Sequence, residues 1–262
     1  MDSLAGQVAL VTGAGRGIGA GIALELATRG ARLALMGRTE GILQESAALI
    51  RSRTGAEVSV HPGDVTDEHS VENVIDAVLR QYARIDVLVN NAGIIDQAQF
   101  LDIELAGWNG VIATNLTGVF LMTQRVARRM RTTGGGSVVN IASIDAYGTD
   151  GPQASYTAAK AGVVGLTKVA ATELAPIKVR VNSVSPGYVH TKMVEEFVSP
   201  NAMRYLLGTF ARVPMQRLVE IEEVARVVAF LAGPGSSAIT GIDVPVDCGT
   251  LSNLYVFETL PT

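Results

Sequence analysis

The feature that most constrains the fold of this chain is a regular alternation between short β-branched runs and longer segments with helical patterns. Strands separated by helices imply right-handed crossovers and a parallel sheet covered on both faces. Because no linker interrupts the series, residues 1–262 are predicted to form a single doubly wound α/β domain with a seven-stranded sheet. The predicted strands are Val8–Thr12, Arg32–Met36, Val58–His61, Val87–Asn90, Ser137–Ile141, Val179–Val184 and Ile242–Val246. The predicted helices are Ile18–Thr28, Gly41–Ser52, Ser70–Tyr82, Leu105–Met130, Ser155–Leu174 and Glu222–Leu231.

Composition narrows the function classes. Formal net charge is −4 with a sequence pI near 5.4, which argues against nucleic-acid binding. The single cysteine, Cys248, excludes an intramolecular disulfide and fits a reducing compartment. No apolar run reaches the roughly 18 residues of a membrane span, and the N-terminus lacks a basic segment followed by an apolar one. We therefore expect a cytoplasmic protein with no membrane and no nucleic-acid partner.

A glycine-rich stretch, Thr12-Gly13-Ala14-Gly15-Arg16-Gly17-Ile18-Gly19, runs from the first predicted strand into the first predicted helix. Glycines at such a turn allow positive φ and bring backbone N–H groups close to a pyrophosphate, and the helix N-terminus adds partial positive charge. The usual dinucleotide fingerprint is matched only loosely, so a tight turn with close helix packing is the alternative. A P-loop is disfavoured because no Gly-Lys-Ser/Thr follows.

Tyr156 and Lys160 stand four residues apart and share one face if the segment is helical. A free tyrosine has a pKa near ~10, and a nearby ammonium could lower that pKa by roughly 1–3 units. Such a pair could exchange a proton with a substrate hydroxyl or carbonyl near neutral pH. The alternative is a surface tyrosine above a solvated lysine.

An ordered set of motifs surrounds this pair. The Thr12–Gly19 loop is followed by Asn90-Asn91-Ala92-Gly93, Asn115, Ser143, Tyr156-x-x-x-Lys160 and Pro186-Gly187. In order and spacing, over about residues 5–249, this set resembles the short-chain dehydrogenase/reductase family. The resemblance implies a single-domain Rossmann fold and an NAD(P)-dependent enzyme that acts on a CH–OH or C=O group of a small molecule.

The end of the second strand indicates which cofactor is used. An acidic residue there would bind the adenosine ribose of NAD, whereas this chain has Gly37 followed by Arg38, with Arg16 in the glycine loop. Two guanidinium groups at one corner suit a 2′-phosphate, so NADP(H) is preferred and NAD remains possible. The alternative is that both arginines are solvated surface residues.

The resemblance implies which residues contact the cofactor. Asp64 would accept from the adenine amino group, Val65 would supply a backbone donor and an apolar flank, and Thr191 would lie near the nicotinamide carboxamide. From the sequence alone, Asp64 could equally be a turn or cap aspartate. The full set is Gly13, Gly15, Arg16, Gly17, Ile18, Gly19, Arg38, Asp64, Val65, Asn91, Ala92, Gly93, Tyr156, Lys160, Pro186, Gly187, Val189 and Thr191.

The predicted catalytic residues are Asn115, Ser143, Tyr156 and Lys160. Tyr156 would exchange the proton, Ser143 would hydrogen-bond the same substrate oxygen, and Lys160 would lower the tyrosine pKa. By the resemblance, Lys160 also holds the nicotinamide ribose and Asn115 holds a water on the proton path. A mid-helix asparagine additionally hints at a local distortion. A nucleophilic Ser143 is disfavoured because no Gly-x-Ser-x-Gly surrounds it. The three histidines lack metal-ligand spacing, so no metal site is predicted.

Residues 188–213 are predicted to face the substrate, with Met193, Val194, Phe197, Met203, Tyr205, Leu206, Leu207 and Phe210, and could equally be a surface helix or lid. The apolar tail, residues 250–262, contains Leu254, Tyr255, Val256 and Phe257, and this composition suggests burial either across a subunit boundary or over a neighbouring subunit's active site. We expect a homotetramer built as a dimer of dimers. Cys248 replaces a usual glycine of the family, and no glycine precedes the sixth strand.

Three other functions remain open on the sequence. One is a catalytically inactive NADP-binding module that senses redox state, which the intact catalytic set disfavours. A second is an epimerase or dehydratase that recycles its cofactor. A third, a Rossmann-like methyltransferase, would not need the tyrosine–lysine pair. The sequence does not identify the substrate or the reaction direction.

Overall fold

The computed structural model describes residues 3–191, 199–208 and 210–253 and contains one parallel seven-stranded sheet. The strand order is β3-β2-β1-β4-β5-β6-β7. Strands β2 and β3 are added on one side of β1, and β4 to β7 are added on its other side, which confirms the predicted doubly wound α/β fold. The strands are β1 (Val8–Thr12), β2 (Arg32–Gly37), β3 (Val58–Pro62), β4 (Val87–Asn90), β5 (Gly136–Ile141), β6 (Val179–Pro186) and β7 (Asp243–Val246).

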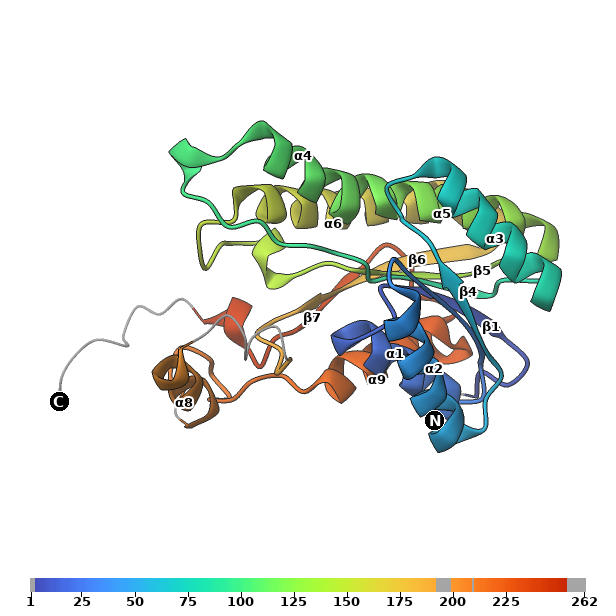
Figure 1. The fold of residues 1–262 in the computed structure, drawn as a ribbon, viewed down its shortest axis with the longest axis horizontal. Helices are drawn as coiled ribbons and strands as arrows, with labels where there is room; N and C mark the ends of the chain where they lie inside the picture. Colours follow the sequence, from blue (N-terminus) through green and yellow to red (C-terminus); the bar gives the residue numbers. More distant parts are fainter. Residues whose placement is uncertain (1–2, 192–198, 209, 254–262) are drawn as a thin grey trace.

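Helices cover both faces of this sheet (Figure 1). One face carries α1 (Gly17–Thr28), α2 (Glu40–Thr54) and α9 (Ile221–Ala232), and the other carries α3 (Glu68–Tyr82), α4 (Leu105–Ile112), α5 (Gly118–Thr133) and α6 (Ala154–Leu174). Each face buries its own aliphatic cluster, because central parallel strands bury side chains in both directions. Shorter elements are α8 (Pro200–Gly208), η1 (Phe100–Asp102), η3 (Ile144–Ala146), η4 (Ala175–Ile177), η5 (Pro234–Ser236) and η6 (Thr250–Ser252).

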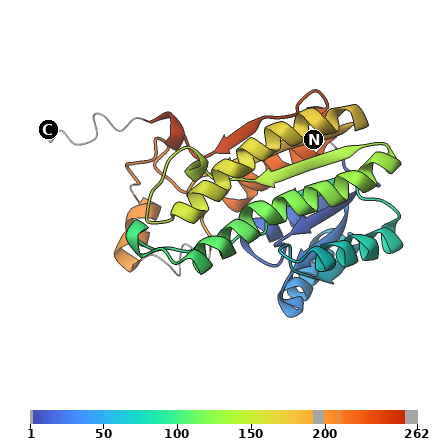
Figure 2. The ribbon, with the colours of Figure 1, turned by 90° about the horizontal axis from the view of Figure 1, so that it is seen from above.

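The predicted helix Leu105–Met130 is a single helix in the structure. Its turn η2 (Ala113–Thr117) has π-helical instead of α-helical hydrogen bonding. This turn contains Asn115, so the predicted local distortion is confirmed. Among the described residues, the continuous helix Leu105–Thr133 is the one that could cross a membrane by length and composition alone. It lies lengthwise beside α6 over the sheet (Figure 2).

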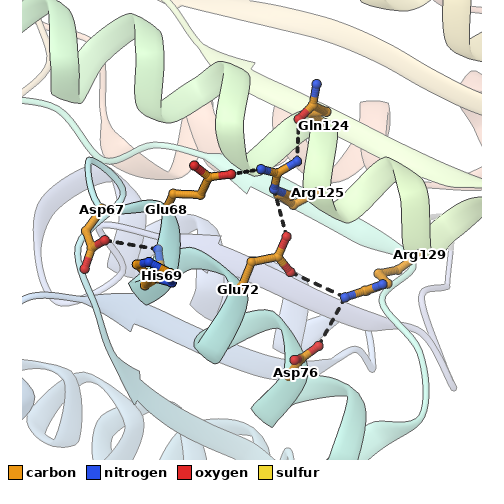
Figure 3. Close-up of polar contacts among 8 residues, drawn as sticks. All are labelled: Asp67, Glu68, His69, Glu72, Asp76, Gln124, Arg125 and Arg129. Atoms are coloured by element: carbon orange, nitrogen blue, oxygen red, sulfur yellow. Dashed lines mark hydrogen bonds and ion pairs between the residues drawn. The ribbon is translucent and has the colours of Figure 1, made fainter.

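Helices α3 and α5 are joined by an ion-pair network (Figure 3). Arg125 on α5 pairs with Glu68 and Glu72 of α3, and Arg129 pairs with Glu72 and with Asp76. The start of α3 is capped by Asp67, whose carboxylate accepts from the backbone N–H of His69 at 3.0 Å. Asp67 therefore satisfies one of the backbone N–H groups left free at the start of this helix.

Two non-glycine residues occupy left-handed backbone positions where the sequence lacks an expected glycine. Lys178, before β6, has φ +60° and Cys248, after β7, has φ +54°. The backbone at both sites therefore keeps a glycine-like conformation at the cost of strain at the substituted residue.

Part of the predicted substrate-facing segment can be described. Phe210 is buried and makes edge-on ring contacts with Tyr188 and Tyr205, and α8 carries Met203, Leu206 and Leu207. Met193, Val194 and Phe197 of that segment, and Leu254, Tyr255, Val256 and Phe257 of the tail, lie outside the described residues.

Candidate active site

The glycine loop after β1 is braced by two side chains. The buried Thr12 hydroxyl accepts from the backbone N–H groups of Asn91 at 3.0 Å and Ala92 at 3.1 Å. The Asn91 amide donates to the backbone oxygens of Thr12 and Gly13, both at 3.1 Å. Asn91 therefore holds the loop in place. The bracing role of Thr12 was not predicted, although its position as the first residue of the glycine motif is a usable signal.

Two glycines in the loop cannot be replaced without moving the backbone. Gly13 has φ +63°, and a Cβ on Gly19 would lie 2.3 Å from the backbone oxygen of Gly13. The loop thus folds back onto the start of α1 at a separation that only glycine permits. Gly15 is also confined, since a Cβ there would lie 2.8 Å from Ile42 Cγ2.

The N-terminus of α1 has the properties of an anion site. Its N-cap, Arg16, makes no side-chain capping bond, and no acidic residue lies in the first turn, which contains Gly17, Ile18 and Gly19. Gly17 has φ +57°, and a Cβ there would meet no atom within 4 Å. Uncapped N–H groups and a macrodipole without a neutralising carboxylate fit a pyrophosphate. These residues therefore fit a dinucleotide.

Arg16 and Arg38 follow neighbouring strands, β1 and β2, at the carboxyl edge of the sheet. Both side chains are exposed, and within the described part of the chain neither makes an ion pair with an acidic residue. Their charge is therefore not neutralised by the protein.

Asp64 and Val65 are partly committed to structure. One carboxylate oxygen of Asp64 accepts from the backbone N–H of Thr66 at 2.9 Å and from the Thr66 hydroxyl at 2.8 Å. This is the turn role that sequence reasoning left open for Asp64. The Val65 side chain is buried in the core and packs toward Gly118 at the start of α5.

Asn115 links the π-helical turn to the segment after β4. Its side chain is fully buried, accepts from the backbone N–H of Ile94 at 2.9 Å and donates to the Ile94 oxygen at 2.9 Å. A Cβ on Gly93 would lie 3.5 Å from Asn115 Oδ1. Asn90, by contrast, donates to Asn140 on β5 at 2.8 Å, as expected for a residue that ties neighbouring strands.

Ser143, Tyr156 and Lys160 come together beyond the end of β5. Ser143 lies two residues after the end of β5, whereas Tyr156 and Lys160 lie one turn apart on α6. The Tyr156 phenol is hydrogen-bonded to the Ser143 side chain. Lys160 is 4% exposed, donates to the backbone oxygen of Ile141 at 2.7 Å, and places Nζ 5.4 Å from the centre of the Tyr156 ring.

The expectation that Lys160 lowers the pKa of Tyr156 is wrong in this structure. Burial raises the pKa of Tyr156 to about 12, a shift that Asp145 and Asp150 enlarge and the Ser143 hydrogen bond reduces. Burial also lowers the pKa of Lys160 to about 8, against the favourable charge of Asp145. Both charged forms lose hydration on burial, and this loss is the largest cause of each pKa shift.

A buried carboxylate that sequence reasoning did not single out lies beside Ser143. Asp145 is 8% exposed, and its Oδ2 accepts from the Ser143 hydroxyl at 3.1 Å and from the Gln153 amide at 3.2 Å. Burial, followed by the negative charge of Asp150, raises the pKa of Asp145 to about 6. Its place two residues after the serine was the available signal.

The Pro186–Gly187 turn lies close to the segment after β7. A Cβ on Gly187 would lie 2.8 Å from the Cα of Asp247. Val189 is buried and forms an isolated parallel bridge with Val219, and Thr191 is partly exposed. Within the residues that the structure describes, no cluster of three or more His, Cys, Asp and Glu side chains could hold a metal ion.

Comparison with known proteins gives concordant results. The profile of the family described as Enoyl-(acyl carrier protein) reductase matches residues 13–250. The 3-oxoacyl-(acyl-carrier-protein) reductase FabG of Thermotoga maritima is 40% identical over 249 residues, covering 94% of this chain and 98% of that protein. A short-chain type dehydrogenase/reductase from Mycobacterium marinum is 38% identical with a TM-score of 0.89, covering 96% and 98% of the two chains. A crystal structure with bound NADP, assigned as a 2-deoxy-D-gluconate 3-dehydrogenase from Agrobacterium tumefaciens, is 34% identical with a TM-score of 0.87 over 96% and 98% of the chains.

Proposed function

This chain belongs to the short-chain dehydrogenase/reductase family of oxidoreductases, and from that premise we propose that it transfers a hydride between NADP(H) and a carbonyl or secondary alcohol, with Tyr156 as general acid and base. The observation that carries the proposal is the meeting of Ser143, Tyr156 and Lys160 at the sheet edge that also bears the braced glycine loop. Bound NADPH supplies hydride chemistry at its nicotinamide ring.

In reduction, the Tyr156 hydroxyl donates its proton to the substrate oxygen. The raised pKa of Tyr156 keeps the phenol protonated at neutral pH, which is the form that can donate. Ser143 donates a hydrogen bond to the same oxygen and stabilises the charge that develops there. Lys160 orients the nicotinamide ribose and, with Asn115, supplies the path by which Tyr156 regains a proton.

The preference for NADP over NAD rests on Arg16 and Arg38. Both guanidinium groups lack a protein counter-charge within the described residues, and both follow strands whose ends border the nucleotide site. A 2′-phosphate would satisfy both. The related structure with bound NADP is consistent with this choice.

We also propose a single domain over residues 1–262, a cytoplasmic location and a homotetramer. The single cysteine supports the reducing compartment. Phe120 on α5 and Val169 on α6, which are 42% and 56% exposed, support an apolar subunit contact on these two adjacent helices. Light scattering tests the assembly, and a monomer would contradict it.

The test of function is a panel of ketones, keto acids and polyols followed by nicotinamide absorbance with NADPH, NADH and their oxidised forms. We expect Tyr156→Phe to abolish turnover while nucleotide affinity changes little. Tyr82→Phe is the matched control, because Tyr82 is buried on α3 and donates to the Leu33 backbone oxygen. If Tyr156→Phe keeps most of the activity, the proposal is wrong. Tight NADP binding by the wild type without turnover of any compound would favour the inactive binding module.

A further inference from the structure

The loop between β5 and α6 carries a polar cluster that the proposed mechanism does not use, in which Asp145 and Gln153 are buried and Asp150 is exposed. It consists of Asp145, Asp150 and Gln153, beside Ser143. The Gln153 amide nitrogen donates to Asp145 at 3.2 Å and to Asp150 at 2.6 Å, so it holds the two carboxylates in one arrangement. The backbone N–H of Asp145 also donates to the Ser143 oxygen at 3.1 Å, and this bond holds Asp145 against the serine.

The Ser143 hydroxyl has one proton to donate. In the structure that proton is directed to Asp145 Oδ2 at 3.1 Å. The proposed reduction needs the same proton to be directed to the substrate oxygen. A hydroxyl cannot donate to both acceptors at once, although its lone pairs can accept further bonds. The state of Asp145 therefore decides what Ser143 can offer.

We infer that Asp145 is a positioning residue that acts through Ser143 and sets whether the serine proton is available to the substrate oxygen. When Asp145 is charged, the serine proton is directed to it and is withdrawn from the substrate oxygen, while the proton of a substrate alcohol still passes to Tyr156. When Asp145 is protonated, its carboxyl donates to the Ser143 oxygen, and the serine proton is directed to a substrate carbonyl. The protonated form of Asp145 thus leaves the serine donor available to the substrate oxygen in both directions, and the charged form removes it. This inference rests on the proposed function.

The charged groups around Asp145 set the pH at which the change occurs. Asp150 in the same loop opposes its ionisation, and Lys160 on α6 favours it. Tyr156, also on α6, is uncharged at neutral pH. The carboxylate of Asp243 at the start of β7 is held by the hydroxyls of Tyr147 at 2.9 Å and Ser183 at 2.6 Å. Burial and Asp150 together bring the pKa of Asp145 to about 6.

The test is the pH dependence of kcat/KM in both directions on one ketone–alcohol pair, measured between about pH 5 and 9. For the wild type we expect kcat/KM for reduction to fall about tenfold as pH rises through about 6, and kcat/KM for oxidation to fall by a similar factor relative to that of Asp145→Asn over the same interval. Asp145→Asn is permanently uncharged, and its amide can still donate to the Ser143 oxygen. Reduction by this variant should stay high to pH 8, with no step near pH 6.

Two further variants should shift the pH at which kcat/KM changes, without removing Asp145. Asp150→Asn removes the opposing charge, so the step should move to lower pH. Gln153→Met removes a donor to the carboxylate, so the step should move to higher pH. Asp102→Asn, on the exposed η1 turn, should leave the profile unchanged.

A step that persists in Asp145→Asn, or shifts in the same direction for Asp150→Asn and Gln153→Met, would overturn the inference. Failure of the proposed function is a separate result. In that case the wild type would turn over no carbonyl at any pH, or Tyr156→Phe would retain activity. A purely structural role for Asp145 would lower the rates at every pH without removing the step.

Discussion

The glycine loop after β1 and the loop that joins β5 to α6 lie at the same edge of the sheet but are built in opposite ways. The first is shaped by missing side chains and by neutral groups, since Gly13 and Gly19 meet at backbone distance and Asn91 and Thr12 brace them. The second is shaped by buried ionisable side chains around Ser143. The nucleotide side therefore depends on sterics, and the catalytic side depends on desolvation.

This difference means that the two sides respond to different changes. An added methyl group damages the glycine loop at any pH. The Ser143 loop tolerates changes of similar size but responds to pH, because burial moves the pKa values of Asp145, Tyr156 and Lys160. Variants on each side can therefore test this difference.

The largest effect is expected for Asn115→Ala. This change leaves both backbone groups of Ile94 without their partner, which should cost about 2–5 kcal/mol of unfolding free energy. Urea denaturation measures the loss. Asn109→Ala, an exposed position on α4, is the control and should stay within about 0.5 kcal/mol of the wild type. A wild-type midpoint for Asn115→Ala would contradict the assignment.

Gly19→Ala should cost about 3 kcal/mol, near the upper end for overpacking, because the obstacle is the Gly13 backbone oxygen at 2.3 Å. Affinity for NADPH should fall more than about tenfold, as measured by fluorescence titration. Gly41→Ala on α2 meets no atom within 4 Å and should be neutral or slightly stabilising. Equal stability of the two variants would show that the loop is less confined than this packing indicates.

A smaller, pH-dependent effect is expected for Asp145→Asn. Burial raises the pKa of Asp145 from 3.8 to about 6, so ionisation destabilises the folded state as pH rises through 6. The variant should be more stable than the wild type by about 2 kcal/mol at pH 8, where the wild-type carboxylate is charged, and no more stable near pH 4. Denaturation at the two pH values measures this. An equal difference at both would mean that Asp145 carries no buried-charge penalty.

The fold and the glycine loop could be predicted because local patterns determine them. The seven strands follow from short apolar runs, and the helix N-terminus after Gly15 follows from its neighbours in sequence. The distortion at Asn115 was also predictable, since asparagine competes for backbone groups inside a helix.

The electrostatics of the catalytic side could not be predicted in the same way. The sequence places Lys160 one turn from Tyr156 but does not say that both are desolvated, so the predicted sign of the tyrosine shift was wrong. The roles of Asp145 and Gln153 depend on how an irregular loop returns between Ser143 and α6. No period or motif in the sequence encodes that path.

The most direct test of the account is an ultraviolet difference titration of nucleotide-free wild type against Tyr156→Phe, which isolates the ionisation of one phenol. If burial dominates the pKa of Tyr156, the absorbance difference between the two proteins should appear only near pH 12. A phenolate step below about pH 9 would contradict the account, because the charge of Lys160 would then outweigh the desolvation of Tyr156.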